Sequence, residues 1–214
     1  MAGYYFHKTP GWLKQLYPSL TWQMDKANKS IYLTFDDGPI PEVTPYVLGQ
    51  LKEYGAHATF FCVGHNIEKH PSVFDQILEG NHSIGNHTFH HLNGWKTNTD
   101  QYLENVQKCQ VEMEKYTGPH SSRLFRPPHG KITRKQIRLL QQTHEIVMWS
   151  YLTGDFDMFL SKEKCLERTI KKVASGDVVV LHDSIKSYAS LSHTLPAMLK
   201  HFSDQGFVFK ALCP

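Results

Sequence analysis

The sequence predicts an α/β fold in which a parallel sheet is covered by helices. Apolar runs rich in β-branched and aromatic residues alternate with stretches whose apolar residues recur at helical spacing. This alternation is typical of strand–helix–strand units, whose crossover helices keep neighbouring strands parallel. About seven such units in 214 residues fit a barrel short of eight strands, although an open doubly wound sheet has the same local pattern.

Each expected strand is short and is followed by a loop or turn. In chain order the strands are expected at 30–35, 58–63, 82–86, 122–126, 145–150, 177–182 and 207–212. Helices are expected in most of the intervals, at Val47/Leu48/Leu51, Val73/Ile77/Leu78, Leu103/Val106/Met113, Ile137/Leu140, Leu166/Ile170/Val173 and Leu195/Leu199/Phe202. Both topologies place chemistry in the loops that follow the strands, so the polar residues there are the candidates for a functional site.

Composition indicates one globular domain and argues against nucleic acid as a partner. The chain has 214 residues, 40% of them hydrophobic, which suffices for one full core but leaves no length for a second. Its net charge of +3 is small, and the densest basic stretch, 131–138, resembles the polar face of a helix. The cysteines are far apart without CxxC spacing, which favours reduced and mostly buried thiols: Cys62, Cys109, Cys165 and Cys213.

Residues 1–29 are expected to pack on or beside a catalytic domain that spans residues 30–214. The N-terminus lacks a basic region followed by an apolar stretch and a cleavage site, so we expect no signal peptide and a cytoplasmic location. No run approaches the ~18 to 20 apolar residues of a membrane span. Trp12, Leu16 and Trp22 have roughly helical spacing, and the alternative to packing is peripheral contact with the inner membrane. The oligomeric state is left open.

Two adjacent carboxylates, Asp36 and Asp37, follow the first expected strand in the sequence TFDDGP. Neighbouring side chains diverge in an extended chain, so the two can serve different partners. One can hold a metal while the other takes a proton. An ordinary Asp-Asp-Gly turn is an equally good interpretation of these residues alone.

A histidine cluster, HTFHH, follows the third expected strand. His87 and His91 are four residues apart and share one face if the segment is helical. Together with Asp37 they form a set of three ligands for Zn²⁺ or a similar divalent ion, which leaves positions open for water and substrate. His90 is a competing ligand, and a chance cluster is the alternative in a chain with 14 histidines.

The sequence FRPPHG follows the fourth strand and is stiffened by its prolines. Arg126 can orient Asp36 through a charge-assisted pair, and the backbone N–H of His129 can face a developing oxyanion. The alternative is a proline turn with a surface arginine.

His182 ends the strongly apolar strand VVVLH and is a natural general acid, because the pKa of histidine lies nearest physiological pH. Asp155, or in its place Asp157, can pair with this histidine and raise its pKa. A satisfied structural histidine is the alternative.

Together these motifs resemble the polysaccharide deacetylase family, or NodB-homology domain, in the order of that family's five motifs: TFDDGP, HTFHH, FRPPHG, TGDFD and VVVLHD. The resemblance implies a deformed, incomplete (β/α) barrel. It also implies a metal-dependent hydrolase that removes N-acetyl groups from N-acetylglucosamine-containing oligo- or polysaccharides. Zn²⁺ is the expected metal, with Co²⁺ or Ni²⁺ as alternatives.

The resemblance also assigns roles to individual residues. It implies a base Asp36, an acid His182 tuned by Asp155, a positioning Arg126, metal ligands Asp37, His87 and His91, and substrate or oxyanion contacts at Pro128, His129, Phe156 and Leu181. His129 stands where the family usually has tyrosine, and Phe156 where it usually has tryptophan. These two departures are expected to alter substrate preference rather than chemistry.

Other interpretations of the same site remain open from sequence. The site can serve a deacylase of an O-acetyl ester, a formyl group or another small amide, or belong to a catalytically silent carbohydrate-binding protein. Trp95 and Tyr151 are candidates for the sugar groove, and either can equally be a packing residue.

Overall fold

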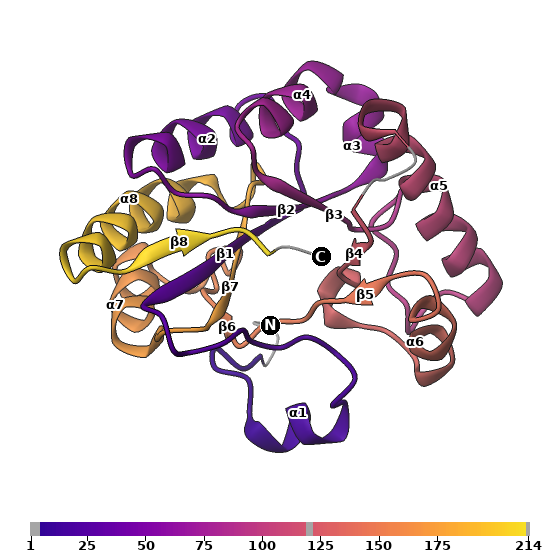
Figure 1. Ribbon diagram of the computed structural model, residues 1–214, viewed down its shortest axis with the longest axis horizontal. Helices are drawn as coiled ribbons and strands as arrows, with labels where there is room; N and C mark the ends of the chain where they lie inside the picture. The colour runs from indigo at the N-terminus through magenta and orange to yellow at the C-terminus, as the bar shows by residue number, and fades with distance from the viewer. Residues whose placement is uncertain (1–4, 119–121, 213–214) are drawn as a thin grey trace.

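The computed structural model describes residues 5–118 and 122–212 and has an α/β architecture with a curled parallel sheet inside a layer of helices (Figure 1). Its strands are β1 (Ser30–Asp36), β2 (Thr59–Cys62), β3 (Ser83–Asn86), β4 (Leu124–Phe125), β5 (Glu145–Ile146), β6 (Tyr151–Leu152), β7 (Val178–His182) and β8 (Val208–Lys210). Its helices are α1 (Gly11–Leu16), α2 (Thr44–Glu53), α3 (Gly64–Lys69), α4 (Pro71–Glu79), α5 (Thr99–Thr117), α6 (Arg134–Leu140), α7 (Lys162–Lys172) and α8 (Tyr188–Asp204).

The sheet has the order β5-β4-β3-β2-β1-β7-β6, and β8 pairs with the beginning of β1. Every strand pairing in it is parallel. β5 and β6 do not pair with each other, so the barrel is incomplete, as the resemblance implied.

The expected strand 145–150 is present only at its start, as β5 (Glu145–Ile146), and β6 (Tyr151–Leu152) begins after its expected end. Between β5 and β6 the backbone turns toward a buried side chain instead of continuing the ladder. Arg126 donates to the carbonyl of Val147 at 3.3 Å and to the carbonyl of Met148 at 2.9 Å. Arg126, which directly follows β4, thus sets where β5 ends. The periodicity of residues 145–150 alone does not reveal this end.

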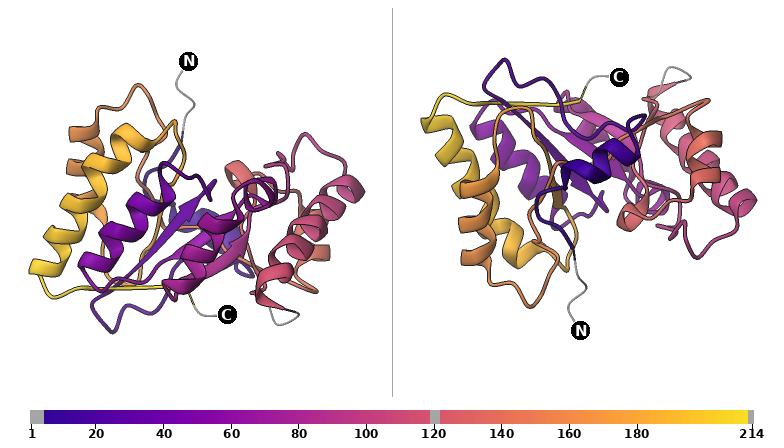
Figure 2. Two further views of the ribbon diagram at one scale, coloured as in Figure 1. Left: turned by 90° about the horizontal axis from the view of Figure 1, so that it is seen from above. Right: turned by 90° about the horizontal axis from the view of Figure 1, so that it is seen from below.

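The N-terminal segment lies along the gap between β5 and β6. Thr21 forms a bridge with Val147, and Lys8 forms one with Tyr151. In the view from below, the indigo α1 crosses the open side of the barrel (Figure 2). The Lys8 ammonium also pairs with Asp177, whose side chain is 4% exposed. The segment therefore takes the place that closing strands would occupy.

The large apolar residues of this segment divide between the core and the solvent-exposed surface. Leu20 and Trp22 are buried in a cluster with Phe125, whereas Trp12 is 59% and Leu16 is 50% exposed. No helix among the described residues is long and apolar enough to cross a bilayer.

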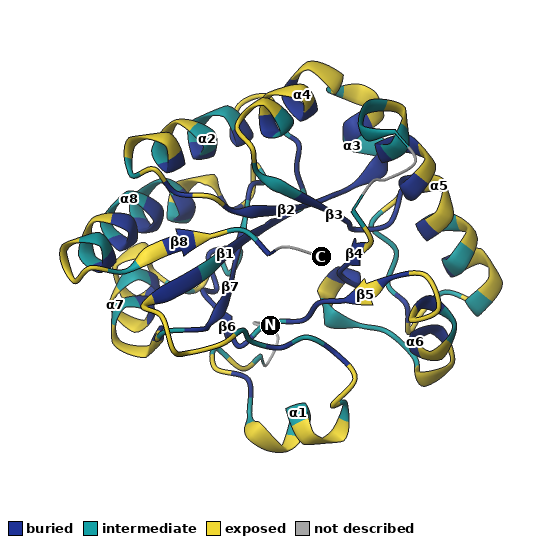
Figure 3. Ribbon diagram, in the orientation of Figure 1, coloured by how far each residue is buried: buried dark blue, intermediate teal, exposed yellow. Residues whose placement is uncertain are grey.

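The core lies between the sheet and the inner faces of the helices, and Figure 3 shows exposed residues on their outer faces. Alternate residues of β7 face opposite sides, so Leu181 packs toward the helices while Val180 and His182 line the inside of the barrel. Cys62, Cys109 and Cys165 are buried free thiols, as predicted, and Cys213 lies outside the described residues.

The expected helices are all present, and local capping explains where several begin. The Asn98 side chain accepts the N–H of Gln101 at the start of α5, and Thr133 with Gln136 forms a capping box at α6. The short helices α1 and α3 were not among the expected elements.

Buried neutral histidines predict loss of stability in acid. Burial lowers the pKa of His144 to about 4 and that of His82 to about 4. The unfolded chain takes up protons below about pH 6.5 while the folded chain resists them, so stability falls as the pH drops from 6.5 toward 4. His144 is 7% exposed, and we expect its resistance to protonation to lower the free energy of unfolding by about 2 kcal/mol at pH 5. Urea unfolding of the wild type and of His144→Gln at pH 7.5 and pH 5 measures this, and an equal pH dependence of the two free energies of unfolding would contradict it.

Candidate active site

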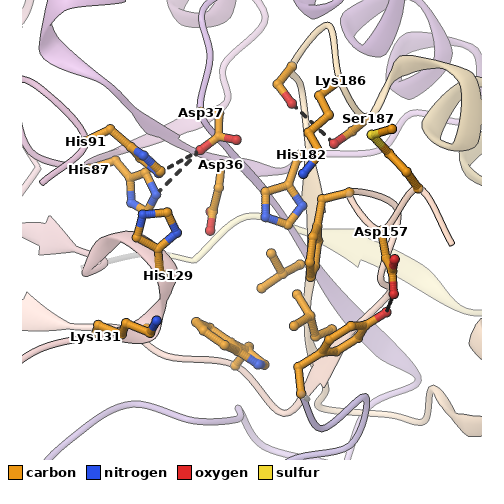
Figure 4. Close-up of a pocket in the computed structure, with 18 of the residues that line it drawn as sticks. Asp36, Asp37, His87, His91, His129, Lys131, Asp157, His182, Lys186 and Ser187 are labelled. Carbon is orange, nitrogen blue, oxygen red and sulfur yellow. Dashed lines mark hydrogen bonds and ion pairs between the residues drawn. The ribbon is translucent and has the colours of Figure 1, made fainter. Parts of the chain in front are cut away.

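A cavity of about 580 Å³ opens at the carboxyl ends of the strands. Its lining includes side chains from all five of the predicted motifs, namely Asp36, Asp37, His87, His91, His129, Phe156 and His182. In the close-up, Asp37 with His87 and His91 lies on one side of Asp36, and His182 lies on the other (Figure 4). The fold thus brings into one cavity residues that are far apart in the sequence.

Asp37, His87 and His91 form the candidate metal centre. The Asp37 Oδ1 is 3.1 Å from the Nε2 of His91 and 3.8 Å from the Nε2 of His87, and ligand atoms of all three lie within 4.8 Å of one another. Two ligands at about 2.0 Å from a tetrahedral Zn²⁺ are themselves about 3.3 Å apart. The donor set therefore fits such an ion.

Hydrogen bonding prepares His87 to act as a ligand. Its Nδ1 lies 2.8 Å from the carbonyl oxygen of Arg126, which accepts a hydrogen bond from Nδ1–H and so leaves Nε2 unprotonated toward Asp37. Burial lowers the pKa of His87 to about 4, so the imidazole is neutral at pH 7. Burial opposes ionisation of Asp37, but the hydrogen bond from His91 and the nearby histidines hold its pKa well below the usual range.

The histidine pair does not lie on a helix. Residues 87–91 form a loop in which Thr88 has φ 61° and His91 has φ 54°. Asp37, in the turn after β1, has φ 86°. Left-handed backbone at residues other than glycine is costly, and here it turns the ligands toward one another. His90 points elsewhere and pairs with Asn105 at 2.8 Å, so the structure does not bring this competing ligand into the centre.

Asp36 is held by a buried guanidinium. Arg126 is fully buried, and its Nη1 donates to the Oδ1 of Asp36 at 2.7 Å and to the hydroxyl of Thr34 at 2.6 Å. Its guanidinium packs on Phe61 at 4.1 Å from the ring centre. Bonds on several sides fix Arg126, so one Asp36 oxygen is committed to it and the carboxylate is held in place.

His182 pairs with Asp155 rather than with Asp157. The Oδ1 of Asp155 is 2.9 Å from Nδ1 of His182, and its Oδ2 accepts the His182 backbone N–H at 2.7 Å. Burial alone would lower the pKa of His182, but Asp155 beside it and the charges of Asp37 and Asp36 raise it to about 9. The imidazole is therefore protonated at pH 7. Asp157 instead accepts the hydroxyl of Tyr5.

The remaining expected contacts divide between the cavity and the core. His129 lines the cavity with φ 60°, and its ring packs edge-on against His91 at 4.6 Å between centroids. Phe156 packs against His182 at 5.0 Å. Leu181 and Pro128 do not line this cavity, because Leu181 points to the opposite face of β7 and Pro128 is buried beneath the turn.

Two proposed groove residues lie elsewhere. Tyr151 is completely buried in the core, and Trp95, although 66% exposed, lies away from the cavity with its indole N–H bonded to the carbonyl of Ile132. The cavity has other apolar walls, including Trp149, Met158 and Phe159. Trp149 was hidden inside an expected strand, and the other two are exposed loop residues without a distinguishing pattern.

Sequence reasoning also missed the groups that hold the Asp37 turn. Asp183 accepts the Gly38 N–H at 3.0 Å and the Thr44 hydroxyl at 2.6 Å, and Asn66 donates to the Asp37 carbonyl at 2.7 Å. Burial and the Asp37 charge raise the pKa of Asp183 to about 8. Asp183 follows His182 directly, and this adjacency was the available signal.

Under the acid role that the resemblance implies for His182, replacing Asp155 with asparagine is expected to move the alkaline limit of kcat for acetate release to lower pH. Burial then acts on His182 without its counter-charge, so the acid form is lost as pH rises through a lower pKa. We expect roughly a tenfold or greater loss of kcat at pH 8 and a smaller loss at pH 6. The pH profile of acetate release measures this, with the wild type as reference. An unchanged alkaline limb would contradict the pairing as the source of the raised pKa.

The incomplete parallel barrel carries a carboxylate–histidine donor set at the carboxyl ends of its strands, an arrangement that can hold a divalent metal ion. A sequence profile of the family described as polysaccharide deacetylase matches residues 23–146. The match spans more than half of the 214 residues, and the chain belongs to the polysaccharide deacetylase family.

Individual relatives agree with this membership. The chain is 34% identical over 201 residues to a peptidoglycan-N-acetylglucosamine deacetylase of Bacillus cereus, covering 92% of this chain and 93% of that protein. It is 28% identical to the peptidoglycan-N-acetylmuramic acid deacetylase PdaC of Bacillus subtilis, covering 86% of this chain but 38% of that protein. A crystal structure of a peptidoglycan N-acetylglucosamine deacetylase in complex with a substituted N-oxidanyl-benzamide has a TM-score of 0.86 and 29% identity, over 95% of each chain.

Proposed function

We propose that this deacetylase hydrolyses the N-acetyl group of N-acetylglucosamine units in a glycan, with a divalent metal at Asp37, His87 and His91. The observation that carries the proposal is the register of β1 and β7, in which Asp36 lies directly opposite His182. Adjacent strands lie about 4.8 Å apart, so a carboxylate and a protonated imidazole face one reaction centre beside the metal ligands.

The ligand set supports Zn²⁺, with Co²⁺ and Ni²⁺ as alternatives that suit the same donors. When bound, the metal supplies Lewis acidity, which polarises the acetamide carbonyl and makes water a better nucleophile. The buried Arg126 carbonyl keeps His87 in the tautomer that such a centre requires.

Asp36 is the proposed base. It takes a proton from the attacking water while Arg126 keeps its carboxylate oriented. The backbone N–H of His129 is the proposed hydrogen-bond donor to the oxyanion that forms at the acetyl carbonyl oxygen. Such a donor typically stabilises the transition state by ~3 to 4 kcal/mol.

His182 is the proposed acid. Amide cleavage needs a proton on the departing nitrogen, and the Asp155 pair keeps His182 charged at neutral pH for this step. The products are acetate and a free amino sugar. Release of the Asp36 proton and uptake of a proton by neutral His182, directly or through solvent, restore both groups for the next turnover.

The Bacillus cereus relative supports N-acetylglucosamine in peptidoglycan as the substrate unit. The Bacillus subtilis relative, which is named for N-acetylmuramic acid, makes that sugar the principal competitor. Identifying which sugar has lost its acetyl group in treated peptidoglycan fragments separates the two, because these fragments contain both sugars whereas chito-oligosaccharides contain only N-acetylglucosamine.

Removing the metal is expected to abolish turnover. Dialysis against a chelator should reduce acetate release by at least about 10²-fold, because the carbonyl then loses its Lewis acid. Titrating Zn²⁺, Co²⁺ or Ni²⁺ back should restore activity at one ion per chain. Replacing His87 with alanine should lower the metal content itself, whereas the exposed His57 replaced by alanine serves as the matched control. Full activity in metal-free protein would overturn the proposed centre.

A further inference from the structure

The N-terminal segment adds an edge to β6 on the side away from β7. The Leu152 N–H donates to the carbonyl of His7 at 2.7 Å, and the Thr9 N–H donates to the carbonyl of Ser150 at 2.9 Å. These bonds continue the sheet in antiparallel direction at the open side of the barrel. Tyr5, two residues before His7, is thereby directed toward the cavity.

Tyr5 enters the cavity wall from this edge. Its hydroxyl donates to the Oδ2 of Asp157 at 2.9 Å, and its ring lies 5.2 Å from that of Phe156. Phe156 in turn packs edge-on against His182 at 5.0 Å. Tyr5 therefore touches the loop on both sides of the peptide that joins Phe156 to Asp157, one contact away from His182.

The 154–159 loop makes room for Tyr5 and His7 at one residue, Gly154. Gly154 has φ +81°, and a Cβ built there would lie 2.7 Å from the Tyr5 hydroxyl and 2.9 Å from the His7 ring. Only glycine combines that backbone angle with so close an approach. The fit of the segment into this space is a second, independent sign that the segment and the loop form one unit.

We propose that Tyr5 is a positioning residue of the active site, which holds the 154–159 loop so that Phe156 and Asp155 fix the ring of His182. This inference rests on the proposed function, because it gives Tyr5 a role through the acid. Tyr5 then supports the active site, although it lies outside the five family motifs. Tyr5, although far from His182 in sequence, thereby influences the step in which His182 protonates the departing amine.

The test compares two substrates that differ in their need for an acid. An N-acetylated chito-oligosaccharide releases an amine that must be protonated, whereas p-nitrophenyl acetate releases a phenolate that needs no proton. Tyr5→Ala should lower kcat for the amide roughly tenfold and change ester hydrolysis much less. Tyr5→Phe, which keeps the ring against Phe156, should retain most amide activity. Trp12→Ala, an exposed aromatic of the same segment, is the matched control and should change neither rate.

A second readout does not depend on turnover. The ring resonances of His182, assigned with His182→Gln, should shift in Tyr5→Ala because the ring current of Phe156 moves, and should stay in place in Trp12→Ala. Equal losses on both substrates with unshifted His182 resonances would overturn the proposal and leave Tyr5 a general structural role. Absence of wild-type amide turnover would instead refute the proposed function, and the resonances would still decide whether Tyr5 positions His182.

Discussion

Replacing Asp36 with asparagine is expected to lower kcat for acetate release by roughly 10²- to 10⁴-fold, because the attacking water loses its base. The change is nearly isosteric, and the asparagine oxygen can still accept from Arg126, so the metal centre at Asp37 should keep its ion. The measurement is single-substrate kinetics together with metal content. KM should change little, since the lost interaction belongs to the transition state.

Two controls make this result specific. Asp75→Asn removes a carboxylate from the exposed surface of α4 and should leave kcat unchanged. Urea unfolding of Asp36→Asn should show whether the unpaired Arg126 charge destabilises the fold, since removing one partner of a buried pair is costly. A folded, metal-loaded Asp36→Asn protein with near wild-type kcat would refute Asp36 as the base.

Replacing His182 with glutamine is expected to lower amide turnover by roughly 10²- to 10⁴-fold and ester turnover far less. The reason is the leaving group: an amine departs only with a proton, whereas p-nitrophenolate departs without one. The ratio of the two kcat/KM values is therefore the decisive quantity. Equal losses on the two substrates would assign His182 to substrate binding or folding instead of proton donation.

The sheet and its order of elements were predictable because parallel strands are buried on both faces and leave continuous apolar runs. β1 and β7 are examples, and both were predicted with nearly their observed bounds. The break between β5 and β6 was not predictable, because it depends on Arg126 from another part of the chain. The closure of the barrel by the N-terminal segment likewise depends on long-range pairings such as Lys8 with Tyr151.

The residues of the candidate site were predictable where strand ends place them, as with Asp36, Asp37 and His182. His87 and His91 come together with Asp37 as predicted, but from a loop with left-handed backbone at Thr88 and His91 and not from the helix that would also have placed them on one face. No local pattern distinguishes Tyr5 as a residue of the cavity. Its position follows from pairing across the open edge of the barrel, and such contacts are invisible in a single sequence. The catalytic roles of the assembled residues stay predictions.

The central claim is that this cavity is a metal-dependent N-deacetylase site. The most direct measurement is acetate release from a series of N-acetylglucosamine oligomers and from peptidoglycan fragments, each with metal-loaded and chelator-treated protein. We expect stoichiometric acetate and free amine from at least one N-acetylglucosamine substrate, loss of both after chelation, and recovery on adding Zn²⁺, Co²⁺ or Ni²⁺. Metal-replete protein that binds these glycans but releases no acetate would contradict the account and would indicate a carbohydrate-binding protein without turnover.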